Sequence, residues 1–194
     1  MHPKPLPTRR HLLCNSLRLG VGMAALVGMG RAYSQLATPA EVLAQLPQAR
    51  PTGKTRMRFL GLSIYDAALW VTPGFAASTY ALHPLALELR YLRNLNGKSI
   101  AERSLQEMRR SGPLEQATEQ RWLRAMQEAF PDVKNGDRLT GVHQPGAETQ
   151  FFFNGALRTT VSDPTFGPVF FGIWLAPWTS EPRLRAELVS DLTP

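Results

Sequence analysis

The feature that most constrains the fold of this chain is the dipeptide Asn154-Gly155, which separates two segments with the composition of β-strands. Asparagine followed by glycine is a preferred sequence for a two-residue hairpin turn, because both central positions need a positive φ. The flanking segments, 149–153 and 156–161, contain the aromatic and β-branched residues that favour strands. The pattern therefore predicts an antiparallel hairpin in this part of the chain.

Strands and helices fall into separate groups along the chain. Residues 57–71 are apolar on both alternating faces, which predicts one central strand covered on both sides. Strands are expected at 57–71, 85–93, 138–143, 149–153 and 156–161, and helices at 39–46, 99–110, 115–130, 180–189 and after Asp163-Pro164. Because this order lacks the alternation of βαβ units, it predicts an α+β fold with helices packed on an antiparallel sheet.

The first 34 residues have the layout of a signal peptide. Their charged residues are all basic: Lys4, Arg9, Arg10, Arg18 and Arg31. An apolar run extends from Leu19 to Gly30, and Ala32 and Ser34 supply the small residues of a cleavage site. The run is shorter than the roughly 20 residues that span a bilayer, so an uncleaved membrane anchor is the less favoured alternative.

We therefore expect a signal peptide at 1–34, cleaved near Ser34, and a single domain at 35–194 that acts in the periplasm or is secreted. Thr8-Arg9-Arg10, followed by one free position and two leucines, resembles the twin-arginine export motif, which a receptor reads and which is no anchor. Paired arginines also occur in ordinary signal peptides, so the general export route remains an alternative.

Composition argues against several classes of function. The chain has 22 basic and 15 acidic residues, but five of the basic ones lie in the leader, which leaves 17 against 15 and a net charge of about +2. This balance argues against a nucleic-acid binder. Cys14 is the only cysteine, and His83 and His143 are the only histidines after the leader. No disulfide, metal site or cofactor is therefore expected.

Five segments, in this order, resemble the bacterial chalcone isomerase-like family: RFLGLSIYDAALW, ALELRYLRNLNGKSIAERSLQEM, AFPDVKNGDRL, FFFNG and VFFGIWL. The resemblance extends from about Gly53 to about Val189. It implies an open-faced β-sandwich, in which a large curved antiparallel sheet carries a layer of helices. It also implies a ligand cleft between sheet and helices, which in plant relatives either cyclises chalcones or holds a fatty acid.

The resemblance further implies a catalytic set for the cyclising relatives: an arginine on an early strand, a threonine on the next strand, and a tyrosine and an asparagine on the following helices. Arg50, Arg56 or Arg58 could match the arginine. The threonine position holds Leu60, or Ser63 in a shifted register. Tyrosine and asparagine are absent from residues 99–130. The chain therefore departs from the catalytic pattern, which favours binding without isomerase chemistry.

Our main hypothesis is a non-catalytic binder of an apolar small molecule such as a fatty acid. The residues expected to contact this ligand are Arg56 or Arg58 at its head group, with Tyr65 and Tyr91. An arginine can hold a carboxylate through two parallel hydrogen bonds without any chemistry. The two tyrosines could instead be strand residues that pack in the core with a bonded hydroxyl.

Two alternatives stay open. One is an intramolecular lyase or isomerase with a non-standard set, Arg56, Tyr65, Tyr91 and Arg93, which would have to converge on one point of the cleft. The other is a periplasmic accessory protein that binds a partner through an exposed aromatic patch, for which Trp70 and Trp178 are the candidates. The sequence does not predict an oligomeric state.

Overall fold

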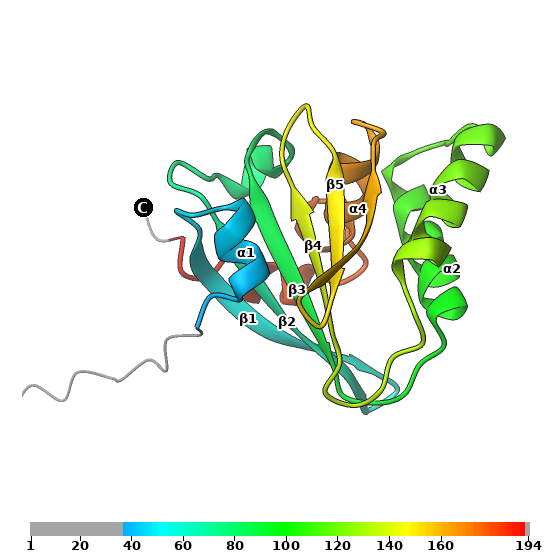
Figure 1. Cartoon of the computed structure of the whole chain (residues 1–194), viewed down its shortest axis with the longest axis horizontal. Coiled ribbons are helices and arrows are strands. Elements are labelled where there is room, and N and C mark those ends of the chain that lie inside the picture. The colour runs from blue at the N-terminus through cyan, green and yellow to red at the C-terminus, as the bar shows by residue number, and fades with distance from the viewer. Residues whose placement is uncertain (1–36, 193–194) are drawn as a thin grey trace, which may run out of the picture. The chain divides into compact units, whose positions relative to one another are not determined.

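The sheet is a six-stranded antiparallel meander in which spatial order follows chain order (Figure 1). The computed structural model describes residues 37–192, so the predicted leader at 1–34 lies outside the described residues. The strands are β1 (Arg50–Phe59), β2 (Leu62–Val71), β3 (Leu85–Tyr91), β4 (Arg138–His143), β5 (Thr149–Phe153) and β6 (Ala156–Val161). The three strands expected at 138–161 are confirmed, and Asn154-Gly155 forms the turn between β5 and β6 with positive φ at both positions.

The hairpin of β1 and β2 shows that the prediction of one strand over 57–71 was wrong. The chain reverses at Leu60-Gly61, where the φ angles are 49° and 79°. Phe59 then pairs with Leu62, and Arg58 pairs with Ser63. A leucine at positive φ is uncommon, and the apolar alternation continues through the turn. Gly61 was therefore the only local signal of the reversal.

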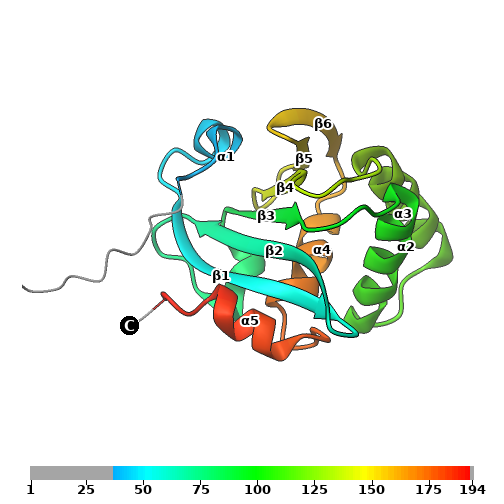
Figure 2. The ribbon, with the colours of Figure 1, turned by 90° about the horizontal axis from the view of Figure 1, so that it is seen from below.

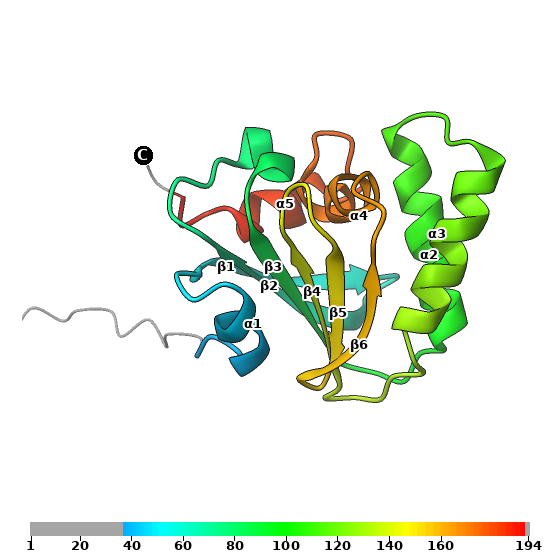
Figure 3. The same ribbon diagram turned by 45° about the horizontal axis from the view of Figure 1, so that its top comes forward.

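The helices lie on both sides of the sheet, but unequally. They are α1 (Ala40–Gln45), α2 (Gly97–Met108), α3 (Gln116–Ala129), α4 (Phe166–Leu175) and α5 (Pro182–Leu188), with 3-10 turns at Ala77–Leu82 and Arg109–Ser111. Figure 3 shows α1 on one side of the sheet and α4 and α5 on the other. The predicted α+β architecture, a sheet with one main layer of helices, is confirmed.

The face of the sheet under α1 has a small core of its own. Val42 and Leu46 of the helix region pack there with Trp70, Ala86 and Val142 of the strands. Trp70 has no exposed surface. The accessory-protein hypothesis required Trp70 to be exposed, so this residue cannot contribute to an aromatic patch.

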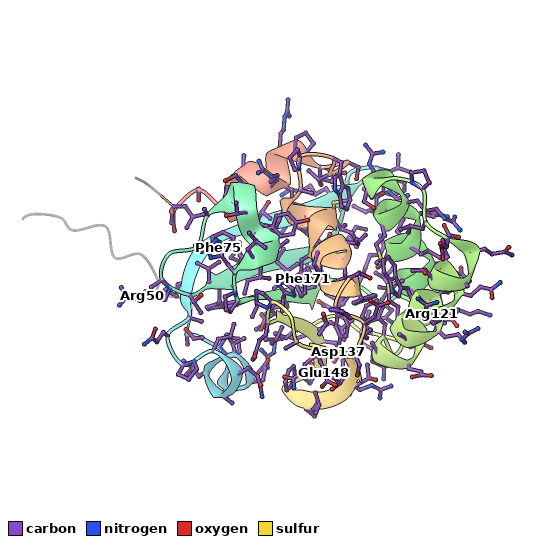
Figure 4. The ribbon with its side chains drawn as sticks, turned by 90° about the horizontal axis from the view of Figure 1, so that it is seen from above. Arg50, Phe75, Arg121, Asp137, Glu148 and Phe171 are labelled. Atoms are coloured by element: carbon purple, nitrogen blue, oxygen red, sulfur yellow. The ribbon has the colours of Figure 1, made fainter. Side chains whose placement is uncertain are left out.

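The opposite face holds the main core, which α4 dominates. Phe166, Phe170 and Phe171 of this helix are buried and pack with Phe151 of β5 and Trp122 of α3. Figure 4 shows Phe171 of α4 near the middle of the domain and Arg121 on α3. Within the described residues, every helix falls short of the length and hydrophobicity that crossing a bilayer requires.

Candidate functional site

A cavity of about 360 Å³ lies between the main face of the sheet and helices α2, α4 and α5. Figure 2 shows these helices around one side of β1, β2 and β3. The apolar and aromatic side chains of its wall come from the sheet, the helices and the loops between them: Met57, Phe59, Ile64, Tyr65, Leu87, Leu89, Tyr91, Leu95, Ile100, Phe130, Leu139, Phe151, Phe170, Ile173, Trp174 and Leu184. A volume and a wall of this kind are typical of small-molecule sites.

Strand register explains which residues of the sheet reach the cavity. Met57, Tyr65 and Tyr91 stand opposite one another on β1, β2 and β3. Because successive side chains of a strand point to opposite faces, these three and Leu89 share the face that α4 covers. The rings of Tyr65 and Tyr91 pack edge to face at a centroid distance of 6.1 Å. Both predicted tyrosines therefore line the cavity.

The two tyrosine hydroxyls differ in their surroundings. Tyr65 accepts a hydrogen bond from Trp174 Nε1 at 3.0 Å. Burial raises the pKa of Tyr65 to about 12, against the opposing effect of this bond. Burial also raises the pKa of Tyr91 above its usual range, and no hydrogen bond contributes to that shift. Both hydroxyls therefore keep their protons at neutral pH and can donate to a ligand.

The two arginines expected at the head group do not line the cavity. Arg56 pairs with Asp66 across the hairpin and donates two hydrogen bonds to its carboxylate, at 2.5 and 2.9 Å. It lies on the other face because it alternates with Met57. Arg58 follows a register shift between Met57 and Arg58 and is exposed near the hairpin turn. Neither position gives the cavity a cation.

The cavity does have a polar end, which α2 and the segment before α5 supply. Its charged residues are Arg103, Glu107 and Glu181. Arg103 Nη2 lies 2.5 Å from Glu107 Oε1, one helical turn away. The Glu107 residue is only 9% exposed, whereas the Arg103 side chain is 61% exposed. The arginine of this ion pair is therefore largely in solvent, whereas the glutamate is buried.

These charged residues were missed by sequence reasoning, although α2 contains a usable signal. Ile100, Arg103, Ser104 and Glu107 recur at the spacing of one helix face, and all four line the cavity. A neighbouring face of α2, with Ala101, Leu105 and Met108, is buried in the core. A partly polar stripe beside an apolar one is typical of a helix face in solvent. It can equally mark a helix that borders a cavity.

The structure does not bring together the residues that the lyase hypothesis and the accessory-protein hypothesis require. Arg56 and Arg93 do not line the cavity with Tyr65 and Tyr91, so the proposed lyase set does not converge there. Trp178 is half-buried, and a Cβ built on Gly172 would lie 2.3 Å from its ring, so the indole packs directly on α4. No group of three or more potential metal ligands occurs within residues 37–192.

Comparisons with known proteins agree with this geometry. A fatty-acid binding protein of Arabidopsis thaliana superposes with a TM-score of 0.58 at 11% identity, over 74% of this chain and 88% of that one, which shows a common fold. An uncharacterised protein of Haemophilus influenzae is 28% identical over 142 residues, which is 72% of this chain and 67% of that protein. The chalcone isomerase-like family matches residues 52–190. The chain therefore belongs to the chalcone isomerase-like family.

Proposed function

We propose that this protein binds an apolar small molecule in the cavity between sheet and helices and that it does so without isomerase chemistry. The observation that carries the proposal is the cavity itself, about 360 Å³ in volume and walled mainly by apolar and aromatic side chains. Burial of apolar ligand surface against such a wall is favourable by about 25 cal/mol for each Å² removed from water. A fatty acid is the first candidate, because the Arabidopsis neighbour is named for that ligand.

The residues around the cavity support binding rather than catalysis. Neither Leu60 nor Ser63, the residues at the expected threonine position, lines the cavity. Asn96 does line it, but its side chain caps α2 by accepting from Ser99 N at 3.1 Å and donates to Asp132 at 2.8 Å. A shared fold alone does not supply a shared reaction.

The proposal includes export. The predicted leader at 1–34 would place the binding domain in the periplasm or outside the cell, through the twin-arginine or the general route. Replacing Arg9 and Arg10 with lysines tests the route. Loss of the exported form supports twin-arginine transport, whereas unchanged export leaves the general signal peptide.

Native mass spectrometry of the gently purified protein tests binding. We expect a bound small molecule that is released on denaturation. Ile100→Trp, which adds bulk inside the cavity, should abolish it, whereas Leu123→Trp should retain it, because Leu123 is also half-buried but does not line the cavity. A reproducibly empty wild-type protein that also takes up no added apolar compound would contradict the proposal.

A further inference from the structure

The turn between β1 and β2 carries an exposed apolar tip, formed by Phe59, Leu60 and Leu62. Among the described residues six large apolar side chains are exposed, and these three fall within one four-residue segment. Leu60 is 87% exposed, and the other two are more than half exposed. Figure 2 shows this turn at the edge of the domain. Single exposed apolar residues are ordinary, whereas a cluster of them marks a surface for a partner.

The sequence of this turn is not the one that its backbone favours. The φ angles of Leu60 and Gly61 are 49° and 79°, and those of Asn154 and Gly155 in the turn between β5 and β6 are 50° and 88°. Asparagine followed by glycine is preferred where both φ angles are positive, and leucine is unfavourable there. Leu60 therefore destabilises the free protein through its backbone and its exposure, and contact with an apolar surface would offset part of this effect.

The charges and the size of this hairpin favour an anionic bilayer as the surface that it meets. Residues 54–66 contain three basic residues, Lys54, Arg56 and Arg58, and one acidic residue, Asp66. Arg58 adjoins the apolar tip, is exposed and forms no ion pair within residues 37–192. Three side chains by themselves do not supply the roughly 800 Å² that each partner buries in a stable protein–protein interface. A bilayer sets no such requirement, because apolar side chains enter its headgroup region to a depth of about 5–10 Å.

The apolar tip is continuous with the wall of the cavity. Phe59 belongs to both, because it is 56% exposed and also lines the cavity. Met57, two residues earlier on β1, lines the cavity as well. Phe59 stands opposite Leu62, so these two side chains share one face of the hairpin. A surface that covers the apolar tip therefore also adjoins the cavity.

We propose that the apolar tip inserts into the surface of an anionic phospholipid bilayer, and that the cavity exchanges its apolar ligand with the membrane from this position. Arg58 contacts the lipid phosphate groups. The strands are paired up to Phe59 and Leu62, so insertion brings few unpaired backbone groups into lipid. Insertion goes beyond the proposed function, and vesicle binding can be measured whether or not the cavity holds a ligand.

Flotation of the purified protein with vesicles tests the proposal. We expect tighter binding to vesicles of phosphatidylcholine and phosphatidylglycerol in equal parts than to phosphatidylcholine alone. Leu60→Asn should weaken binding by about tenfold, because it removes the most exposed side chain of the apolar tip. This variant should fold, since asparagine suits the turn. Arg58→Gln should weaken binding to the anionic vesicles by about fivefold.

Leu82→Asn is the matched control. Leu82 is 72% exposed but follows the far end of β2, roughly 30 Å along that strand from Leu62, and its substitution should leave vesicle binding unchanged. Leu60 does not line the cavity, so native mass spectrometry should find the ligand retained in Leu60→Asn.

Two results would overturn the inference. One is equal vesicle binding by wild type and Leu60→Asn, or none by either, and a ligand retained in that case leaves the proposed function standing. The other is a dimer, seen by light scattering, that Leu60→Asn converts to a monomer while no vesicle binding occurs. That result would assign the apolar tip to a second copy of the chain.

Discussion

Each face of the sheet carries a cluster of arginines and glutamates, and the two clusters differ in how fully they are buried and bonded. Under α1, Arg138 Nη1 donates to Glu88 at 2.5 Å and to Glu41 at 3.2 Å, Thr140 also donates to Glu41, and Arg90 lies 3.7 Å from Glu88. In the cavity wall, Arg103 lies 2.5 Å from Glu107, whose other carboxylate oxygen is 3.9 Å from Arg110, and Glu181 has no ion pair among the described residues.

The difference separates a cluster that supports the fold from a cluster that borders the cavity. Glu41 and Glu88 are about 95% buried, and their arginine is mostly buried as well, so this cluster joins α1 to β3 and β4 with little access for a ligand. The cavity cluster reaches solvent at Arg103, whose side chain is 61% exposed. Similar side chains therefore support the fold on one face and border the cavity on the other.

The largest effect expected from this comparison concerns stability. Arg138→Met removes the arginine that hydrogen-bonds two buried carboxylates, leaving Glu88 with Arg90 at 3.7 Å, and should lower the free energy of unfolding by about 3 kcal/mol, because poorly paired buried charge is strongly unfavourable. Ligand binding by the folded variant should not change. Arg121→Met, which removes an exposed arginine 3.7 Å from Asp163, is the control and should cost about 0.5 kcal/mol or less. Similar losses in denaturant titrations of both variants would contradict the structural role of Arg138.

The two tyrosines of the cavity also differ in hydrogen bonding, and we expect their substitution to change the free energy of unfolding by smaller amounts. Tyr65→Phe leaves the Trp174 Nε1 donor without its acceptor and should lower the free energy of unfolding by about 1–2 kcal/mol. Tyr91→Phe removes a hydroxyl for which no hydrogen bond is seen and should cost less than about 0.5 kcal/mol. Thermal unfolding of the pair measures the difference. If Tyr91→Phe is the more damaging change, the Tyr91 hydroxyl has a structural partner.

Arg103→Met should affect stability less than Arg138→Met does. The Arg103 side chain is largely exposed, so its pair with Glu107 resembles a surface pair, and the expected loss is less than about 1 kcal/mol. Its effect on the ligand should be clearer: a fatty acid such as dodecanoate should bind more weakly, because Arg103 is the arginine of the cavity wall. A loss of stability as large as that of Arg138→Met would remove the contrast between the two clusters.

The smallest expected effect concerns the free energy of unfolding at low pH, to which the ion pair of Arg56 with Asp66 contributes. The hydrogen bonds from Arg56 hold the pKa of Asp66 below its usual range. A carboxylate with a depressed pKa stabilises the fold above its unfolded pKa near 4, and this contribution is lost as pH falls through the folded value. Arg56→Gln should therefore make the free energy of unfolding fall less steeply as the pH decreases. The change should be slight, because the pair is exposed. Arg58→Gln, at a site without an ion pair in residues 37–192, should leave this dependence on pH unchanged.

Much of the sheet could be predicted from the sequence because its signals are local. Residues 149–153 and 156–161 contain the aromatic and β-branched residues that favour strands, and Asn154-Gly155 specifies the hairpin turn. The turn between β1 and β2 was not predicted, because it lies within an apolar run and has Leu60 at a positive φ, which leucine rarely adopts. The error lay in the turn chemistry rather than in strand propensity.

The site was predicted only where it depends on the sheet. Tyr65 and Tyr91 reach the cavity because they alternate with core residues on neighbouring strands. The prediction that Arg56 contacts the ligand was wrong, because it was made without knowing the strand register. The register places Arg56 opposite Asp66 on the other face of the sheet. Arg103 and Glu181 come from elements that meet the sheet only through tertiary packing, so no local pattern indicates that they share a cavity.

The crystal structure of the protein soaked with dodecanoate tests the central claim most directly. We predict continuous density for an alkyl chain between Tyr65, Tyr91 and α4. An empty cavity at saturating ligand, or a ligand bound only elsewhere on the surface, would contradict the claim that this cavity is the binding site.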